Sequence, residues 1–149
     1  MNKGFRRLLI FTLREERYAL DLGKVAEVME PPPSFPVPRA PHYITGIINF
    51  HGALVALLDL AGFFTTGAAM PGGKILVLHR TIANLAFQVD TVENIVSEEV
   101  VLEESESADP LIARLLVMAD GEISELAVEK ILERLESVFD GQSWRPDGT

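Results

Sequence analysis

The stretch Tyr43–Phe64, YITGIINFHGALVALLDLAGFF, indicates how the chain folds. Its first part is an apolar strand that ends at Phe50, His51-Gly52 forms a corner, and a second apolar run extends over 53–60. Because Asp59 is the only interruption of the second run, this run is too apolar for a strand with one face in water. We therefore expect a β-hairpin that is covered by protein on both faces, with a second sheet as the covering layer.

The composition of the 149-residue chain is that of a globular protein. Hydrophobic residues make up 48% of the chain, which is enough for a sizeable core and argues against intrinsic disorder. The length fits one domain, or two small halves that share a core. The absence of cysteine excludes disulfides, thiolate chemistry and cysteine-based zinc sites, and it fits a reducing cytoplasm.

The charge of the chain argues against two classes of partner. The formal net charge is -9, and so acidic a surface repels nucleic-acid phosphates and anionic lipid headgroups. The apolar run Leu8–Leu13 is too short for a signal peptide, and the charged residues Arg14–Arg17 follow it directly. No stretch is long enough to span a bilayer. We therefore expect a cytoplasmic protein without nucleic-acid binding or direct membrane insertion.

Apolar runs and turn signals predict short strands that are joined mostly in hairpins. Besides the central hairpin, the expected strands lie at 8–13, 18–22, 75–78, 85–89, 92–96, 100–102, 111–118 and 123–128. The six prolines within 31–41 predict an extended connector on the surface. Asp120-Gly121 predicts a hairpin turn, because both residues tolerate a positive φ. The acidic segment 98–109 is expected to be mainly a solvated loop, and helical spacing of apolar residues over 128–139 predicts a C-terminal amphipathic helix.

The two halves of the chain show the same apolar pattern. A shift of 67 residues places Leu8–Phe11 on Ile75–Leu78, and a shift of about 68 aligns the first strand of the central hairpin with 111–116. A shift of 69 places the turn residue Gly52 on Gly121. Apolar positions match while identities mostly differ, which indicates a duplicated structural unit.

The repeat predicts a mainly β fold of two similar barrels, each of about five strands, followed by the C-terminal helix. We expect a single domain over 5–140, with subdomains at about 5–70 and 74–140 and a tail at 141–149. Each half is near the size below which a single core is marginal, so the barrels should share one core and unfold together. A groove along the seam between the barrels is a natural place for a partner helix or strand.

Several segments occur in the order and spacing of a known family. They are Leu9–Leu13, Tyr18–Leu22, Val25–Val28, Ala40–Asn49 and Leu58–Leu60. Over about residues 5–64 the chain resembles the CheW-like chemotaxis coupling proteins, and the second half resembles them more loosely to about Leu135. The most specific part of the resemblance is the pattern from Gly46 to Leu60, which is GIINFHGALVALLDL here.

The resemblance implies a non-enzymatic adaptor with no cofactor and no metal site. Members of the family fold as two SH3-like five-stranded barrels and connect the cytoplasmic tip of chemoreceptors to the regulatory domain of the histidine kinase CheA. The receptor helix is received in the groove between the barrels, and the kinase docks on a barrel end through strand edges and apolar patches. The resemblance also implies the positions that contact the receptor or kinase, which are Val25, Glu27, Gly46, Asn49, His51 and Gly52.

Four positions depart from the family pattern. His51 stands where the family usually has an arginine that pairs with the glutamate matched by Glu27. Arginine is permanently charged and binds a carboxylate bidentately, whereas histidine keeps only a pH-dependent form of this contact. Ala56 replaces the usual proline, Arg114 the usual glycine of the second half, and Ala127 an acidic or amide residue. We expect these changes to affect affinity for the kinase or receptor more than the fold.

Other interpretations stay open from the sequence. One is a divergent CheW-like scaffold of another chemosensory-type pathway, and another is a small-ligand-binding β-barrel. A small enzyme would need convergent catalytic groups, which the sequence does not offer, and a nucleic-acid-binding pair of barrels conflicts with the acidity. We interpret His42 and His79 as ordinary surface or turn residues, and Asp21 and Asp59 as hydrogen-bonding residues at strand ends. His51 has either a turn or contact role, or no special role.

Overall fold

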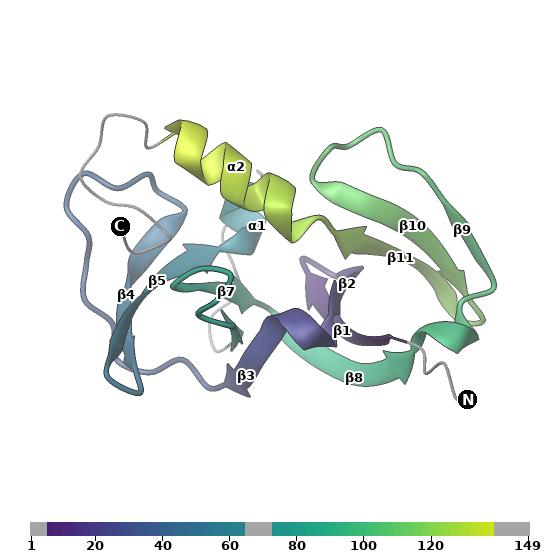
Figure 1. Cartoon of the computed structure of the whole chain (residues 1–149), viewed down its shortest axis with the longest axis horizontal. Helices are drawn as coiled ribbons and strands as arrows, with labels where there is room; N and C mark the ends of the chain where they lie inside the picture. The colour runs from purple at the N-terminus through teal and green to yellow at the C-terminus, as the bar shows by residue number, and fades with distance from the viewer. Residues whose placement is uncertain (1–5, 65–72, 139–149) are drawn as a thin grey trace.

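The computed structural model describes residues 6–64 and 73–138, which form two β-sheets with α2 along the top of the view in Figure 1. The elements are β1 (Arg7–Leu13), β2 (Glu16–Asp21), the 3-10 turn η1 (Leu22–Lys24), β3 (Val25–Met29), β4 (Ile44–Phe50), β5 (Ala53–Asp59), α1 (Leu60–Phe63), β6 (Lys74–Leu78), β7 (Leu85–Val89), β8 (Thr91–Ser97), the 3-10 turn η2 (Glu98–Val100), β9 (Glu103–Ser105), β10 (Ile112–Met118), β11 (Gly121–Leu126) and α2 (Val128–Val138). The mainly β fold class and the C-terminal helix are confirmed. The expected tail at 141–149 lies outside the described residues.

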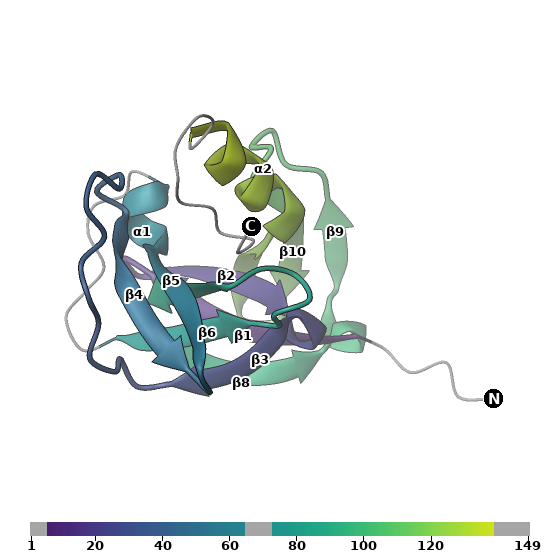
Figure 2. The same cartoon turned by 60° about the vertical axis from the view of Figure 1, so that its left-hand side comes forward.

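Each sheet takes strands from both halves of the chain. Sheet A has the order β8-β1-β2-β11-β10-β9, and sheet B has the order β3-β6-β7-β5-β4. The N-terminal hairpin β1–β2 therefore lies among strands of the second half (Figure 1), and β6–β7 lies among strands of the first half (Figure 2). The two sheets fit the two expected SH3-like units, but the chain passes from one to the other and back. The subdomain boundary near residues 70–74 stays a prediction.

The two sheets are built to the same plan. When β1–β5 are matched with β6, β7, β8, β10 and β11, the sheets have the same strand order, apart from the extra strand β9 at the edge of sheet A. Leu8 pairs with Asp21, and Ile75 pairs with Gln88, which corresponds to the predicted shift of 67 residues. The parallel pairs β2–β11 and β7–β5 are equivalent as well. The duplicated unit is therefore confirmed, with its first two strands exchanged between the copies.

One detail of the predicted repeat is wrong. Phe50 pairs with Ala53 in β4–β5, and Met118 pairs with Gly121 in β10–β11, so the shift stays at 68 and Gly52 is not the equivalent of Gly121. Gly121 begins a strand with a φ of 138° instead of standing at the centre of the turn. The two turn residues before it do not adopt a positive φ, so this hairpin uses a different turn type from the first.

The acidic segment 98–109 contains more regular structure than the expected loop. It includes η2 and the short strand β9, which pairs with β10, whereas the strand expected at 100–102 is not formed. The sequence of β9 is EES, which contains no apolar residue, and all three side chains are exposed. The hydrophobic pattern on which the prediction relied is therefore missing from this strand.

Backbone hydrogen bonds hold the connecting segments against the sheets. Phe35, in the proline-rich connector, exchanges two backbone hydrogen bonds of 2.9 and 2.7 Å with Ile47 of β4. The expectation of a connector that lies on the surface is thus confirmed. The carboxylates of Asp21 and Asp59 each accept a hydrogen bond from a backbone N–H two or three residues later, as expected for strand-end residues.

Apolar side chains form one shared core and two smaller cores. The largest cluster joins both sheets and both helices, with Phe11, Phe87 and Leu135 among its fully buried members. The smaller cluster of sheet A comprises Leu8, Ile10, Ala19, Leu116, Met118 and Ile123, and that of sheet B comprises Ile48, Val55, Leu57, Ile75, Val77 and Ala86. The shared core is therefore confirmed, and the smaller clusters repeat the duplication at the level of side chains.

We expect neither half of the chain to fold alone. A fragment of residues 1–70 contains β1–β2 but neither β8 nor β11, which flank that hairpin in sheet A. Each isolated fragment should give the poorly dispersed ¹H–¹⁵N spectrum of an unfolded chain, and an equimolar mixture of 1–70 and 71–149 should restore the dispersed spectrum of the whole protein. A dispersed spectrum from either fragment alone would contradict this expectation.

Candidate docking surface

The β4–β5 hairpin ends in a tight two-residue turn. His51 and Gly52 have φ values of 50° and 86°, and a positive φ at both turn residues matches the twist of the two strands. The side-chain Oδ1 of Asn49 accepts a hydrogen bond of 2.9 Å from the backbone N–H of Gly52. Asn49 and Gly52 therefore shape the turn that presents His51 to solvent.

Two of the predicted contact residues have packing roles. A Cβ atom on Gly46 would lie 2.9 Å from the backbone oxygen of Phe35, so only glycine fits under the proline-rich connector. Val25 is 9% exposed and belongs to the shared core. The role of Gly46 and Val25 in partner contact stays a prediction.

Glu27 of β3 lies beside the turn. The Nε2 atom of His51 is 3.7 Å from Oε1 of Glu27, and the two side chains are 76% and 46% exposed. The two side chains are thus close enough for the pairing that the resemblance implied. They form an ion pair only when the imidazole is protonated. An exposed pair contributes little to folding stability, so both side chains are available to a partner. Their role in partner contact stays a prediction.

Strands β3 and β8 are edge strands of sheets B and A, and both lie in the lower part of the views in Figures 1 and 2. Val28 pairs with Leu76, Ile95 pairs with Leu9, and the two residues are related by the shift of 67. They are 40% and 47% exposed. Exposed β-branched side chains on open strand edges are typical of contact surfaces. Sequence reasoning missed them as site residues, although the predicted shift of 67 residues relates Val28 to Ile95.

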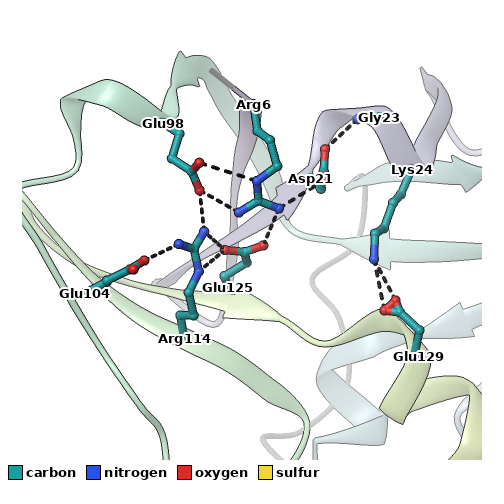
Figure 3. A network of polar contacts seen from close by, with 9 residues as sticks. All are labelled: Arg6, Asp21, Gly23, Lys24, Glu98, Glu104, Arg114, Glu125 and Glu129. Carbon is teal, nitrogen blue, oxygen red and sulfur yellow. Dashed lines mark hydrogen bonds and ion pairs between the residues drawn. The ribbon is translucent and has the colours of Figure 1, made fainter. Parts of the chain in front are cut away.

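Charged side chains gather on sheet A, where Arg114 and Glu125 lie side by side (Figure 3). Arg114 pairs with Glu125 across β10–β11. The equivalent pair in β4–β5 is Gly46 and Leu57. The guanidinium of Arg114 contacts Glu125 and two further glutamates. Because the side chain of Glu125 is only 7% exposed, its charge needs a nearby counterion, which the residue that replaces the family's glycine provides.

Arg6 ties the start of the described chain to this network (Figure 3). Its guanidinium nitrogens lie 2.5 Å from Oε1 of Glu98, 3.1 Å from Oδ2 of Asp21 and 3.4 Å from Oε2 of Glu125. Hydrogen bonds from Arg6, and then from Arg114, hold the pKa of Glu98 below its ordinary value, against the opposing effect of desolvation. The network therefore joins the N-terminal segment to β2, η2, β10 and β11.

Comparison with known proteins identifies the family. A model of the CheW-like domain matches residues 7–136. The chain belongs to the CheW-like family. The matched residues span both sheets and most of α2, so the match covers the duplicated unit as a whole.

Relatives of this CheW-like chain are chemotaxis proteins by name. The chain is 26% identical over 105 residues to the probable chemotaxis protein CheW of Rhizobium etli, which covers 68% of both proteins. It is 27% identical over 133 residues to the chemotaxis protein CheW of Thermotoga maritima, which covers 86% of this chain and 88% of the relative. Among solved structures, the scaffolding protein TtCheW from Thermoanaerobacter tengcongensis is similar with a TM-score of 0.76 and 23% sequence identity, over 87% of this chain and 93% of that chain. This last similarity supports the fold alone.

The described part of the CheW-like domain contains neither a group of metal-binding side chains nor a membrane-spanning helix. Among residues 6–64 and 73–138, no group of three or more histidine, aspartate or glutamate side chains is placed to hold a metal ion. No helix in the described part of the chain is long and apolar enough to cross a membrane. His42 and His79 are both exposed, as expected for surface or turn residues.

We expect removal of Arg114 to destabilise the CheW-like domain, because the carboxylate of Glu125 would stay buried without its main counterion. Arg114→Met should lower the free energy of unfolding in urea by about 2 kcal/mol, allowing for partial solvent screening. The double variant Arg114→Met/Glu125→Leu, which copies Leu57 of sheet B, should return it to within about 1 kcal/mol of the wild type. Lys74→Met, which breaks the exposed pair with Glu30, is the control and should cost less than about 0.5 kcal/mol. A double variant as unstable as the single variant would refute this role for Arg114.

The lowered pKa of Glu98 predicts a specific loss of stability in acid. Glu98 stabilises the fold above its ordinary pKa of 4.5, and this contribution is lost as the pH falls through the lowered value. Urea unfolding between about pH 6 and about pH 3 should therefore depend less on pH in Glu98→Gln than in the wild type. Glu99→Gln, a change at the exposed neighbour, should keep the wild-type dependence. The same dependence in all three proteins would show that the network does not act through Glu98.

Proposed function

We propose that this CheW-like protein is a non-enzymatic cytoplasmic adaptor that couples chemoreceptors to the histidine kinase CheA. The observation that carries the proposal is the exposure of Val28 and Ile95 at equivalent positions of two edge strands. Family membership over 7–136 supports it. A second surface, at the Glu27–His51 turn, lies on the same β scaffold. Two surfaces on one rigid scaffold are what an adaptor requires.

We assign the receptor to the edges of β3 and β8. Val28 and Ile95 occupy equivalent places in the duplicated unit, so they present two similar apolar contacts at the junction of the sheets. A helix with apolar residues along one face matches such a surface, because its side chains recur every three or four residues on that face. The helical tip of a chemoreceptor is the partner of this kind in the CheW-like family.

We assign the kinase regulatory domain to the end of sheet B that carries the β4–β5 turn. Glu27 projects from β3 and His51 from the β4–β5 turn, and both side chains are exposed. A partner can pair with either charge, and the fixed turn lowers the entropy cost of that contact. Glu27 directly precedes Val28 in β3, and successive side chains of a strand point to opposite faces, so the two partners contact different faces of this strand and can be bound at once.

The departures from the family pattern favour a second candidate, a divergent scaffold of another chemosensory-type pathway. His51 offers a partner a weaker and pH-dependent charge where the family usually has a permanent one. Arg114 and Glu125 add a charged network in sheet A where sheet B has Gly46 and Leu57. These changes would suit a kinase and receptor that differ from the standard ones.

Calorimetric titration against a receptor-tip fragment and the kinase regulatory domain from the same cell tests the adaptor function. The double variant Val28→Asp/Ile95→Asp should weaken receptor binding at least about tenfold and leave kinase binding within about twofold of the wild type. Leu102→Asp is the matched control, because Leu102 is 65% exposed but lies beside β9 of sheet A. Failure of the wild type to bind either partner would overturn the proposed function.

The substitution His51→Arg separates the two candidates. With a standard CheA regulatory domain, a permanent charge beside Glu27 should strengthen binding about threefold. This gain would indicate a protein adapted to a different kinase. Unchanged affinity for this CheA domain would show that His51 does not influence the choice of kinase.

A further inference from the structure

A pocket of about 210 Å³ opens beside the β4–β5 turn, at the end of sheet B. Its lining comes from the β4–β5 hairpin with its turn, from β3 and β6, and from the loop between β6 and β7. Its deep lining is apolar, with Val55, Val77, Leu78 and Ala83 all buried and Phe50 partly buried beside them. The pocket therefore offers a dry surface that an apolar group can fill.

The rim of this pocket is basic, although the protein as a whole has a net charge of -9. His79 and Arg80 are exposed residues of the β6–β7 loop, and His51 stands on the turn across from them. Glu27 does not line the pocket, and its Oε1 atom lies 3.7 Å from Nε2 of His51. Within residues 6–64 and 73–138, the guanidinium of Arg80 makes no ion pair. A permanent positive charge thus stands unpaired at the mouth of an apolar pocket.

Backbone hydrogen bonds hold the pocket in shape. The N–H groups of Ile82 and Ala83 donate to the carbonyl of His79 at 2.9 and 3.2 Å, and the N–H of His79 donates to the carbonyl of Lys24 at 3.1 Å. The N–H of Ala56 in β5 donates to the carbonyl at the other end of the loop at 3.0 Å. A site that is already formed costs little conformational entropy when a partner binds.

The size of the pocket fits one side chain. Sites for small organic ligands usually have volumes of roughly 300–1,000 Å³, and this pocket is smaller. Pockets that accept a single aromatic or aliphatic anchor are the centres of many protein interfaces. The apolar floor selects such an anchor, and the basic rim selects a negative charge close to it.

We propose that this pocket is the anchor site for the partner that docks at the β4–β5 turn. It receives one large apolar side chain of the partner, and a carboxylate next to that side chain lies against Arg80 and His79. This inference rests on the proposed function, since it assigns the chemistry of the segment that the kinase regulatory domain presents. Arg80 and His79 then determine specificity, because they attract an acidic neighbour of the anchor and repel a basic one.

The first experiment uses small probes on the full-length protein and needs neither kinase nor receptor. Phenylpropionate, phenylpropanamide and phenylpropylamine share a ring and differ in charge, and ¹H–¹⁵N spectra report their binding. The anion should bind about threefold more tightly than the amide, the amine should bind most weakly, and the largest shifts should fall around Ala53 and Asn84. Arg80→Gln should abolish the difference between anion and amide, whereas Arg7→Gln, at an exposed residue of β1, should keep it. Equal affinities in the wild type, or shifts away from the pocket, would overturn the proposal.

The second experiment measures binding of the kinase regulatory domain from the same cell. Ala53→Trp fills the pocket and Arg80→Glu reverses its rim charge, so each should weaken kinase binding about tenfold while receptor-tip binding stays within about twofold. Arg7→Glu is the control for a change of charge alone.

Lost probe binding with intact kinase binding in these variants would overturn the pocket proposal and leave the adaptor function standing. Absence of kinase binding by the wild type would overturn both, and probe binding with unchanged kinase affinity would make the pocket a small-molecule site.

Discussion

The pairing of β1–β2 with strands of the second half is the constraint on which the rest of this structure depends. Because each sheet borrows a hairpin from the other half, neither sheet is complete without the whole chain. The exchange closes the shared core from both sides and brings β3 and β8 out as edges. The edges and the β4–β5 turn are therefore fixed relative to each other. The adaptor function that we propose requires such a fixed relation between two docking surfaces.

The duplicated unit also explains how one fold provides two different ends. Sheet B has Gly46 under the proline-rich connector and Leu57 within its apolar cluster. Sheet A has Arg114 and Glu125 at the same two places, and Arg6 completes their charge network. Burying a carboxylate costs free energy unless a cation meets it, so Glu125 at this place requires a counterion such as Arg114. Sheet B therefore keeps an apolar contact where sheet A carries a network of charges.

The strands, the helix and the duplication were predictable from the sequence, because alternating and helical apolar patterns depend on residue type alone. The strand partners were not predictable in this way. Leu8–Phe11 and Ile75–Leu78 carry the same apolar pattern, so pairing within a half and pairing between halves bury the same faces. Strand β9 was missed because its EES sequence is wholly exposed and contains no apolar residue.

For the candidate site, the contact between Glu27 and His51 was predictable from the family resemblance. The burial of Glu125 was not, because it depends on Arg6 and Arg114, which reach it from distant parts of the chain. The exposure of Val28 and Ile95 was also hidden, since an apolar residue in a short strand is normally expected in the core. Only the order of strands in a sheet shows which of them are edges.

The exchanged hairpin also sets an order of events during synthesis. Strands β1 and β2 leave the ribosome well before β8 and β11, between which they insert. At about 5–20 residues per second, the nascent chain carries this apolar hairpin without its neighbours for several seconds. The final sheet can close only after nearly all of the described chain has emerged, so the fold is completed late in the synthesis of the CheW-like domain.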